Sequence, residues 1–369
     1  MRWVAASLAV LALLAGCFAP KAGSMEGPLA RHDTIGHVFV IVLENEDYAR
    51  TFGKPPPSPY LAENLTRMGR LLSDYYGIGH ASLGNYVAMV SGQAPNVATQ
   101  ADCPYFTEFA GQVAPDGQAV GQGCVYPAGV KTIADQLEAA GRSWRLYAED
   151  MANGTGQPTA CRHPAIGAQD TSQGSGGERD QYATRHVPFV YFHSVIDDQK
   201  RCDSHLVDLN HLPADLAAAA TTPEFAFIVP DVCSDGHDAR CANPRQRGEY
   251  DGIDDFLRAW VPRILASPAY QKDGLLVVTF DEAEQGSPDA CCDEPTGHNT
   301  ARPGITGPGG GRTGTVLLAP CLDAGTVDAT PYNHYSLLRT LEDLWGLPHL
   351  GYAGQAGLAP INLAPCRAA

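Results

Sequence analysis

Residues 37–43 read HVFVIVL, and Glu44 and Asn45 follow them directly. An apolar run of this length, rich in β-branched residues and without polar alternation, is typical of a strand that is buried on both faces of a sheet. Two similar runs occur later in the chain, FAFIV at 225–229 and LLVVTF at 275–280. Strands of this kind occur mostly in parallel sheets that helices cover on both faces, so these three runs decide the fold class.

Helix-like segments separate the strand-like runs. Ser58 and Pro59 provide an N-cap and a first-turn proline for a helix that extends to about residue 71. Further helices are predicted at 131–140, 251–266 and 335–345, and a weaker strand at 313–318. This alternation predicts an α/β fold with a mostly parallel sheet sandwiched between helices.

The composition excludes two classes of protein. The chain has 369 residues, of which 44% are hydrophobic, so a largely disordered chain is excluded. Its 25 Lys and Arg residues against 41 Asp and Glu residues give a formal net charge of −16. A nucleic-acid-binding protein needs a basic surface, so no nucleic-acid partner is expected. An anionic substrate is compatible with this charge, because a metal ion can reverse the field inside one pocket.

The first 17 residues have the features of an export signal. Arg2 precedes an apolar segment, 4–15, that is too short for a stable membrane anchor. The segment ends in Leu-Ala-Gly-Cys17, which matches the lipobox of bacterial lipoproteins, in which the cysteine becomes the lipidated N-terminus. Residues 1–17 are therefore predicted to be a lipoprotein signal peptide, with an ordinary cleaved signal peptide as the alternative. The protein is expected outside the cytoplasm, held to a bacterial membrane by the lipid on Cys17.

The cysteine content agrees with export. Apart from Cys17 the chain has ten cysteines and no C-x-x-C pair. In an exported protein this even number indicates disulfides rather than a cysteine metal site, although the pairing stays open. Two glycine-rich stretches, 154–177 and 286–314, are expected to be long loops tied by these disulfides. Residues 18–34 are expected to be a tether, and residues 35–369 a single domain.

Acidic residues follow each of the three buried runs. Glu44 and Asn45 follow the first run, Asp231 the second, and Asp281 and Glu282 the third. If the strands are parallel neighbours, these side chains meet at one edge of the sheet. Four carboxylates in one place repel one another unless a cation lies among them, so the sequence predicts a metal site. The alternative is that each acid is a helix cap or a solvated loop residue.

The predicted ligands are hard oxygen atoms. They suit Mg²⁺, Ca²⁺ or Mn²⁺, whereas a histidine in the same site would favour Zn²⁺. The histidines expected near this rim are His237, in the segment 231–238 (DVCSDGHD), and His334. Each of them has the alternative role of a loop residue with an ordinary hydrogen bond.

Residues 80–86 (HASLGNY) are a second group of residues that could take part in catalysis. The run before them is strand-like and the run after them is helical, so Ser82 is expected at a strand-to-helix turn. Backbone N–H groups at a helix N-terminus favour a bound phosphate or a developing anion. Ser82 would otherwise only cap the helix. An α/β-hydrolase elbow is excluded, because His80 stands where its G-x-S-x-G motif needs a glycine.

Four motifs, in this order, resemble the bacterial phosphoesterase family that contains acid phosphatases and phospholipases C and belongs to the alkaline phosphatase superfamily. They are VLENEDY at 42–48, HASLGNY at 80–86 with Ser-Gly at 91–92, TFDE at 279–282, and YNHYSLLRTLED at 332–343, with smaller echoes at 143–150 and 185–189. The resemblance extends over nearly the whole chain after the leader. It departs at Ala81 and Gly84, where family members commonly carry prolines.

The resemblance implies roles for particular residues. Glu44, Asn45, Asp281 and Glu282 would bind the metal, and Ser82 would be the nucleophile. Asn85 matches an asparagine that contacts phosphate in related nucleotide phosphodiesterases. Further candidates are Asp231 and Asp235 as metal ligands, and His237, His186 and His334 as catalytic histidines.

These observations together predict an exported, metal-dependent phosphoric-ester hydrolase, most simply an acid phosphatase that acts on phosphomonoesters through a phosphoserine on Ser82. The expected partners are a phosphate-ester substrate and the membrane, with no protein partner. The alternatives are a phospholipase C-type phosphodiesterase, a sulfatase-like or phosphonate-cleaving enzyme, and a surface lipoprotein that binds ligands without catalysis.

Overall fold

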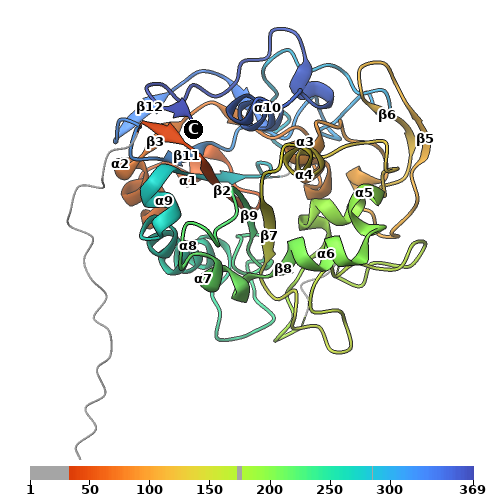
Figure 1. Ribbon diagram of the computed structural model, residues 1–369, viewed down its shortest axis with the longest axis horizontal. Coiled ribbons are helices and arrows are strands. Elements are labelled where there is room, and N and C mark those ends of the chain that lie inside the picture. Colours follow the sequence, from red (N-terminus) through yellow and green to blue (C-terminus); the bar gives the residue numbers. More distant parts are fainter. Residues whose placement is uncertain (1–32, 173–176, 285) are drawn as a thin grey trace, which may run out of the picture.

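One mixed sheet of eight strands forms the centre of the fold in a computed structural model that describes residues 33–172, 177–284 and 286–369. In spatial order the strands are β12 (Thr326–Asp328), β3 (Arg70–Leu72), β11 (Thr315–Leu318), β10 (Gly274–Phe280), β2 (His37–Leu43), β9 (Phe225–Val229), β7 (Trp144–Ala148) and β8 (Leu206–Asp208). β11 pairs antiparallel with both of its neighbours, whereas the other pairs are parallel. The predicted α/β fold with a mostly parallel sheet is confirmed (Figure 1).

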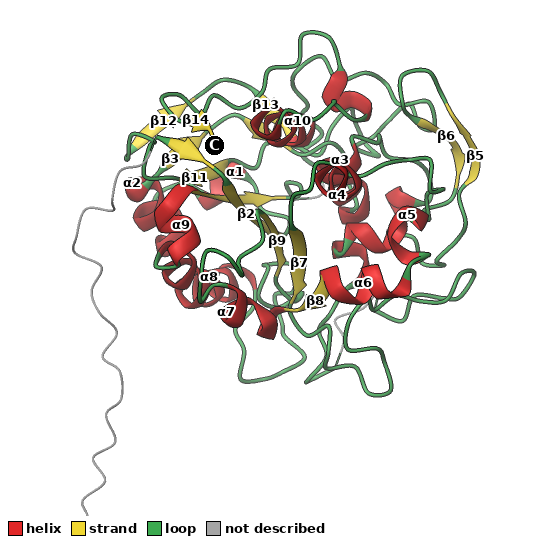
Figure 2. Ribbon diagram, in the orientation of Figure 1, coloured by secondary structure: helices red, strands yellow, loops and turns green. Residues whose placement is uncertain are grey.

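Helices and three small strand pairs surround this sheet (Figure 2). The helices are α1 (Tyr48–Thr51), α2 (Thr66–Met68), α3 (Ser82–Ser91), α4 (Ile133–Ala139), α5 (His193–Ile196), α6 (Gln199–His205), α7 (Leu212–Asp215), α8 (Glu249–Leu265), α9 (Pro268–Asp273) and α10 (His334–Trp345), with a π-helical turn η1 (Tyr60–Leu65) and 3₁₀ turns η2 (Thr99–Ala101), η3 (Thr184–His186), η4 (Pro188–Tyr191), η5 (Leu209–His211) and η6 (Gly351–Gly354). The small pairs are β1 (Thr34–Ile35) with β14 (Arg367–Ala368), β4 (Tyr75–Tyr76) with β13 (Tyr332–Asn333), and β5 (Ala110–Val113) with β6 (Ala119–Gln122).

The first face of the sheet packs against α3, α4 and α10. Val38, Val40 and Val42 of β2 belong to one hydrophobic core with Leu83 of α3 and Leu338 of α10. Side chains alternate between the faces of a strand, so every second residue of β2 points to these helices. Burial of each such side chain contributes about 1.5–3 kcal/mol.

The opposite face packs against α8 and α9, which lie together on the other side of the sheet in Figure 1. Phe39, Ile41 and Leu43 of β2 form the second core with Ile253 and Leu257 of α8. Because both sets of β2 side chains are buried, the strand shows no polar alternation in its sequence.

One predicted helix has the wrong extent. The segment that begins at Ser58 forms the π-helical turn η1 and the short α2, and it ends at Met68 rather than near residue 71. Gly69 is extended, with φ −133° and ψ −157°, and Arg70 begins β3. The apolar residues at 71 and 72 therefore belong to the sheet, where they pair with β11 and β12.

A disulfide ties the first long loop, 154–177, to α6 as expected, whereas the disulfide in the second, 286–314, joins two adjacent residues and does not tie that loop to another element. The ten cysteines of the domain form five pairs, Cys103–Cys124, Cys161–Cys202, Cys233–Cys241, Cys291–Cys292 and Cys321–Cys366. The predicted signal peptide and most of the predicted tether, 18–34, lie outside the described residues, and β1 already begins at Thr34. Across the described ranges, none of the helices combines the length and the apolar character that crossing a bilayer requires.

Candidate active site

Three neighbouring strands bring acidic side chains to one edge of the sheet. β10, β2 and β9 lie side by side and run in the same direction. Glu44 and Asp281 come directly after β2 and β10, and both are fully buried. Asp231, which follows β9 after Pro230, and Glu282 are buried as well. The carboxyl ends of these strands therefore place four carboxylates inside the protein.

The carboxylates influence one another electrostatically. Burial raises the pKa of Glu44, and it raises the pKa of Asp281 and of Glu282 well above the usual range. The charge of Glu44 adds to the rise at Asp281 and Glu282. Ionised together, such groups repel strongly, and a divalent cation among them would remove this repulsion.

Ser82 is the first residue of α3, at the turn that the sequence predicts. Its Oγ donates a hydrogen bond to Glu44 Oε2 at 2.7 Å, and the Tyr86 hydroxyl donates to Glu44 Oε1 at 2.6 Å. Residues four apart lie on the same face of a helix, so α3 presents both hydroxyl groups to one carboxylate. The predicted nucleophile and a predicted metal ligand are thus in direct contact.

Asn45 completes an oxygen-rich group with Glu44 and Asp281. Its backbone is left-handed, with φ 54°, a conformation that asparagine tolerates better than most residues. With its nitrogen turned to the carboxylates, the amide donates to Asp281 Oδ1 at 3.1 Å and to Glu44 Oε2 at 3.0 Å. With its oxygen turned there instead, the amide would offer a cation an oxygen atom beside those of the two carboxylates. Asp281 Oδ2 is buried and has no hydrogen-bond partner among the described residues, so this group fits a hard divalent cation.

A second group shares Glu44 and adds His186 and Asp235. One ligand atom of each lies within 4.8 Å of the others, and all three side chains are fully buried. His186 Nε2 is 3.4 Å from Glu44 Oε1, and His186 Nδ1 is 3.3 Å from Asp235 Oδ2. The two ring nitrogens of His186 form no hydrogen bond within the part of the chain that the structure describes. The same is true of Asp235 Oδ2. Burial lowers the pKa of His186 well below its usual value, which favours the neutral ring that a metal needs.

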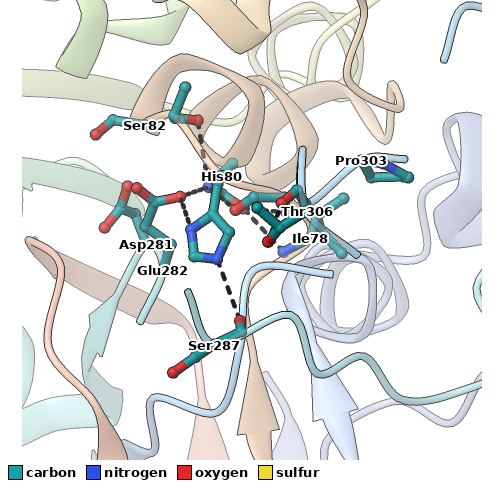
Figure 3. Close-up of polar contacts among 12 residues, drawn as sticks. Ile78, His80, Ser82, Asp281, Glu282, Ser287, Pro303 and Thr306 are labelled. Carbon is teal, nitrogen blue, oxygen red and sulfur yellow. Dashed lines mark hydrogen bonds and ion pairs between the residues drawn. The ribbon is translucent and has the colours of Figure 1, made fainter. Parts of the chain in front are cut away.

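His80 connects the turn before α3 to the second long loop (Figure 3). Its Nδ1 lies 3.1 Å from Glu282 Oε2, and its Nε2 lies 3.1 Å from the backbone carbonyl oxygen of Ser287. The backbone N–H of His80 donates to the carbonyl of Pro303 at 3.3 Å. One buried side chain therefore orients Glu282 and fixes the loop beside it.

Asn85 holds the loop before Ser82. Its Oδ1 accepts from the backbone N–H groups of Ile78 and Gly79 at 2.8 and 3.0 Å. Its Nδ2 donates to the Gly79 carbonyl at 2.9 Å and lies 3.4 Å from Glu282 Oε2. The structure gives Asn85 positioning contacts, and its contact with phosphate stays a prediction.

His334 does not reach the rim where the sequence suggests a catalytic histidine. It is fully buried at the start of α10, its Nδ1 lies 3.1 Å from the Tyr75 hydroxyl, and its Nε2 contacts the backbone carbonyl of Asp281. Burial lowers its pKa to about 4. A proton donor must touch the leaving group, so the predicted role does not fit this orientation. His334 instead supports the backbone of Asp281.

Asp231 is engaged in its own turn. Its Oδ1 accepts from the backbone N–H groups of Cys233 and Ser234 at 3.0 and 2.8 Å, and its Oδ2 lies 3.4 Å from Gln181 Nε2. This turn directs Asp235 towards the second group. Asp231 as a metal ligand stays a prediction.

His237 is the most accessible of the three predicted histidines. Its side chain is 33% exposed, whereas His186 and His334 are fully buried. Its Nδ1 lies 2.8 Å from Asp238 Oδ1, and its Nε2 lies 3.3 Å from a guanidinium nitrogen of Arg185. Of the three, only His237 therefore presents part of its side chain to solvent.

Three residues of the site received no role from the sequence, although each lies in a motif that resembles the family. Tyr86 stands four residues after Ser82, and this helical spacing was a usable signal. His80 and Arg185 gave no comparable signal, because only the folded chain brings them to Glu282 and to His237.

Comparison with known proteins identifies the family of this chain. A model of the phosphoesterase family matches residues 58–348. The chain belongs to the phosphoesterase family. This phosphoesterase is 28% identical over 320 residues to a phosphate-repressible acid phosphatase of Penicillium chrysogenum, covering 84% of this chain and 59% of the relative. It is 27% identical to a probable acid phosphatase of Kluyveromyces lactis, covering 88% and 61%.

A bacterial relative covers more of its own length. The phosphatidylinositol-3-phosphatase of Mycobacterium tuberculosis is 26% identical over 326 residues, covering 88% of this phosphoesterase and 81% of the relative. The two fungal relatives are longer, so this chain spans about three fifths of their length.

Solved structures show only a distant likeness to this phosphoesterase. A protein of the alkaline phosphatase superfamily from Vibrio parahaemolyticus aligns with 85% of this chain and 67% of its own, with 12% identity and a TM-score of 0.45. A phosphonate monoester hydrolase from Silicibacter pomeroyi aligns with 88% and 75%, with 11% identity and a TM-score of 0.43. The fold class stated above depends on the sheet itself and not on these matches.

Proposed function

We propose that this protein is an exported, metal-dependent phosphoric-ester hydrolase that cleaves phosphomonoesters through a phosphoserine on Ser82. The observation that carries the proposal is the 2.7 Å hydrogen bond from Ser82 Oγ to Glu44 Oε2 at the N-terminus of α3. A serine whose proton is held by a carboxylate, in a buried polar site, is prepared for nucleophilic attack. The names of the fungal and mycobacterial relatives, all phosphatases, support the same chemistry.

The residues present fit a divalent cation in two adjacent positions. Glu44, Asn45 and Asp281 would hold it with oxygen atoms, which suits Mg²⁺, Ca²⁺ or Mn²⁺. Glu44 with His186 and Asp235 would hold it with a nitrogen atom included, which favours Zn²⁺. When bound, the cation polarises a phosphoryl oxygen and lowers the pKa of the serine hydroxyl.

Glu44 accounts for the proton that Ser82 gives up and regains in the proposed reaction. Ser82 Oγ attacks phosphorus while its proton passes to Glu44 Oε2, which it already contacts. The ester bond to the leaving oxygen breaks, and that oxygen takes up a proton from the solvent. Water then attacks the phosphoserine and releases a proton to the solvent, the bond from Ser82 Oγ to phosphorus breaks, inorganic phosphate leaves, and Ser82 regains its proton from Glu44.

The first test is hydrolysis of p-nitrophenyl phosphate by the protein without residues 1–17. We expect the Ser82→Ala variant to lose at least about 1,000-fold in kcat, because the nucleophile is gone. Its circular dichroism and melting temperature should stay close to those of the wild type. EDTA should abolish the activity, and added metal should restore it.

Tyr86→Phe is the matched control, since it removes the other hydroxyl group on Glu44. It should lower kcat much less, by about 2- to 20-fold, because it removes one hydrogen bond and not the nucleophile. Full activity in Ser82→Ala would overturn the proposal. A wild type that binds metal and hydrolyses no ester would favour the non-catalytic lipoprotein instead.

A panel of substrates separates the remaining alternatives. Bis-p-nitrophenyl phosphate and phosphatidylcholine test the phospholipase C-type diesterase, and p-nitrophenyl sulfate tests the sulfatase-like enzyme. Phosphatidylinositol 3-phosphate belongs in the panel because of the mycobacterial relative's name. We expect the monoesters to give the highest kcat/KM. Attachment through a lipid on Cys17 is a separate proposal, tested by mass spectrometry of the exported protein.

A further inference from the structure

Arg185 is a buried cation beside this site that the mechanism above does not use. It lies in η3, which packs against α3, and only 2% of it is exposed. Burial raises the pKa of Glu44 and the pKa of Asp235. The positive charge of Arg185 lowers both pKa values in part. The guanidinium is therefore within electrostatic reach of the carboxylates that surround Ser82.

The partners of Arg185 are neutral groups. Its Nη1 donates to the backbone carbonyl of Ser172 at 3.2 Å, and its Nη2 lies 3.3 Å from His237 Nε2. The Nδ1 of that ring faces the Asp238 carboxylate at 2.8 Å and therefore carries the ring proton, so Nε2 accepts from Arg185. These contacts use two of the five N–H donors of the guanidinium. Within the described ranges it forms no salt bridge with a carboxylate.

Arg162, another buried arginine, is paired with an acid, whereas Arg70, like Arg185, contacts neutral groups. Arg162 forms a bidentate salt bridge with Asp180, in which Nη1 and Nη2 lie 2.7 and 2.8 Å from the two carboxylate oxygens, and its guanidinium lies over the ring of Tyr182. A guanidinium that is removed from water without an anionic partner costs free energy. An anion that arrives as substrate would compensate this cost, and phosphate matches the planar fork of arginine.

The acidic surroundings make such a cation necessary. Glu44, Asp281 and Asp235 repel a phosphate ester, and the chain as a whole has a net charge of −16. The backbone N–H of Leu83, beside Ser82, is already bound to Asp102 Oδ1 at 3.0 Å. The first turn of α3 therefore has one donor fewer for an incoming phosphoryl group.

We propose that Arg185 binds the phosphoryl group of the substrate, donating from its guanidinium to the non-bridging oxygens, while the Ser172 carbonyl and His237 hold it in place. The inference rests on the proposed function and names the residue that recognises the substrate anion. A monoester dianion gains more from this contact than a diester monoanion, so Arg185 favours monoesters.

The experiment measures binding and turnover separately. Isothermal titration calorimetry of the metal-loaded protein with inorganic phosphate gives a Kd that does not depend on catalysis. We expect Arg185→Gln to weaken phosphate binding by about 10- to 100-fold and to raise KM for p-nitrophenyl phosphate by a similar factor, since a charge-assisted contact is lost. Hydrolysis of bis-p-nitrophenyl phosphate should fall less. Arg185→Lys, which keeps the charge and loses the fork, should give an intermediate Kd.

Arg162→Gln is the matched control, because it removes a buried arginine that is paired inside the protein. It should lower the melting temperature and leave the phosphate Kd within about twofold of the wild type. An Arg185→Gln variant that is folded and binds phosphate like the wild type would overturn the inference, as would a wild type that binds no phosphate. If Arg185→Gln does not fold, Arg185→Lys decides, and a wild-type Kd in that variant contradicts recognition by the fork.

The two proposals fail in different ways. Phosphate binding that depends on Arg185, without hydrolysis of any ester, would overturn the hydrolase proposal and support this one. Hydrolysis that depends on Ser82, with a phosphate Kd and KM that do not respond to Arg185, would overturn this inference alone.

Discussion

The backbone at Ala81 determines how the chain enters α3 at Ser82. Ala81 has φ 76° and ψ 123°, a conformation that costs a non-glycine residue about 1–3 kcal/mol. Its N–H faces the Glu282 carboxylate and lowers the pKa of that group, against the larger effect of burial. Members of the family that the sequence motifs resemble commonly carry proline around this serine. Proline has φ fixed near −65° and no backbone N–H. The turn in this chain therefore needs a residue that adopts a positive φ.

Two substitutions at Ala81 test this reading. We expect Ala81→Pro to lower kcat for p-nitrophenyl phosphate by at least about 100-fold, because the turn cannot form and Glu282 loses a donor. Ala81→Gly should keep kcat within about threefold and the free energy of unfolding within about 1 kcal/mol, because glycine adopts this φ without strain. An Ala81→Pro enzyme with wild-type kcat would show that the positive φ is dispensable.

The sequence predicts which residues lie at the site where the direction of a strand alone determines their place. Glu44 and Asp281 follow buried strands, so the sequence indicates that they meet once the strands are taken as neighbours. Side-chain direction was not predictable in this way. His334 turns inward because its Nε2–H donates to the Asp281 carbonyl and its Nδ1 accepts from the Tyr75 hydroxyl, and both contacts exist only in the folded chain.

At the scale of elements, α10 carries a buried acid on its core-facing side. Glu342 is fully buried; its Oε1 accepts from the backbone N–H of Leu350 at 2.8 Å, and its Oε2 finds no hydrogen-bond partner among the described residues. Burial raises its pKa to about 8. Between the ordinary carboxyl pKa and pH 8 the folded state keeps a proton that the unfolded state releases. Stability from this group is therefore complete at low pH and is lost as the pH rises towards 8.

Glu342→Gln should remove this dependence, because it keeps the acceptor for Leu350 without an ionisable proton. Relative to wild type, its free energy of unfolding should increase by about 3 kcal/mol between pH 5 and pH 8. Urea unfolding with intact disulfides measures this difference at each pH. Glu63→Gln, at an exposed position, is the control and should show no such change. A constant difference for Glu342→Gln would mean that this carboxyl is ionised in the folded protein throughout the range.

Elements were predictable from the sequence where apolar periodicity is long and uninterrupted. The strands β2, β9 and β10 and the helices α8 and α10 were found within two residues of their ends. The segment after Ser58 was not, because its apolar residues continue from η1 through α2 into β3. The apolar residues of this run belong first to a helix and then to a strand, so their spacing follows neither the helical nor the strand period throughout. Only Gly69 marks the boundary between the helix and the strand.

At the scale of the whole molecule, the candidate site joins segments that are distant in the sequence. Glu44 follows β2, Ser82 begins α3, His186 ends η3, and Asp281 follows β10. A cation held by these residues would link both halves of the sheet to the helices of one face. Binding would then stabilise the entire fold, because the unfolded chain cannot present the same ligands together.

Metal binding should therefore raise the melting temperature of the full domain. At a metal concentration of about 100 times Kd the gain is about 2.7 kcal/mol, which for a domain of this size corresponds to roughly 5 °C. Differential scanning calorimetry with Mg²⁺, Ca²⁺, Mn²⁺ and Zn²⁺ after EDTA treatment measures it. Glu44→Gln should abolish the shift, since Glu44 belongs to both groups, whereas the exposed Glu63→Gln should keep it.

The same measurement distinguishes the two positions of the cation. If the cation lies between Glu44, Asn45 and Asp281, Asn45→Ala reduces the shift and His186→Ala leaves most of it. If it lies between Glu44, His186 and Asp235, the order is reversed and Zn²⁺ gives the largest effect. A melting temperature that responds to none of the four metals would contradict a cation site, and the buried carboxylates would then have to keep their protons in the folded protein.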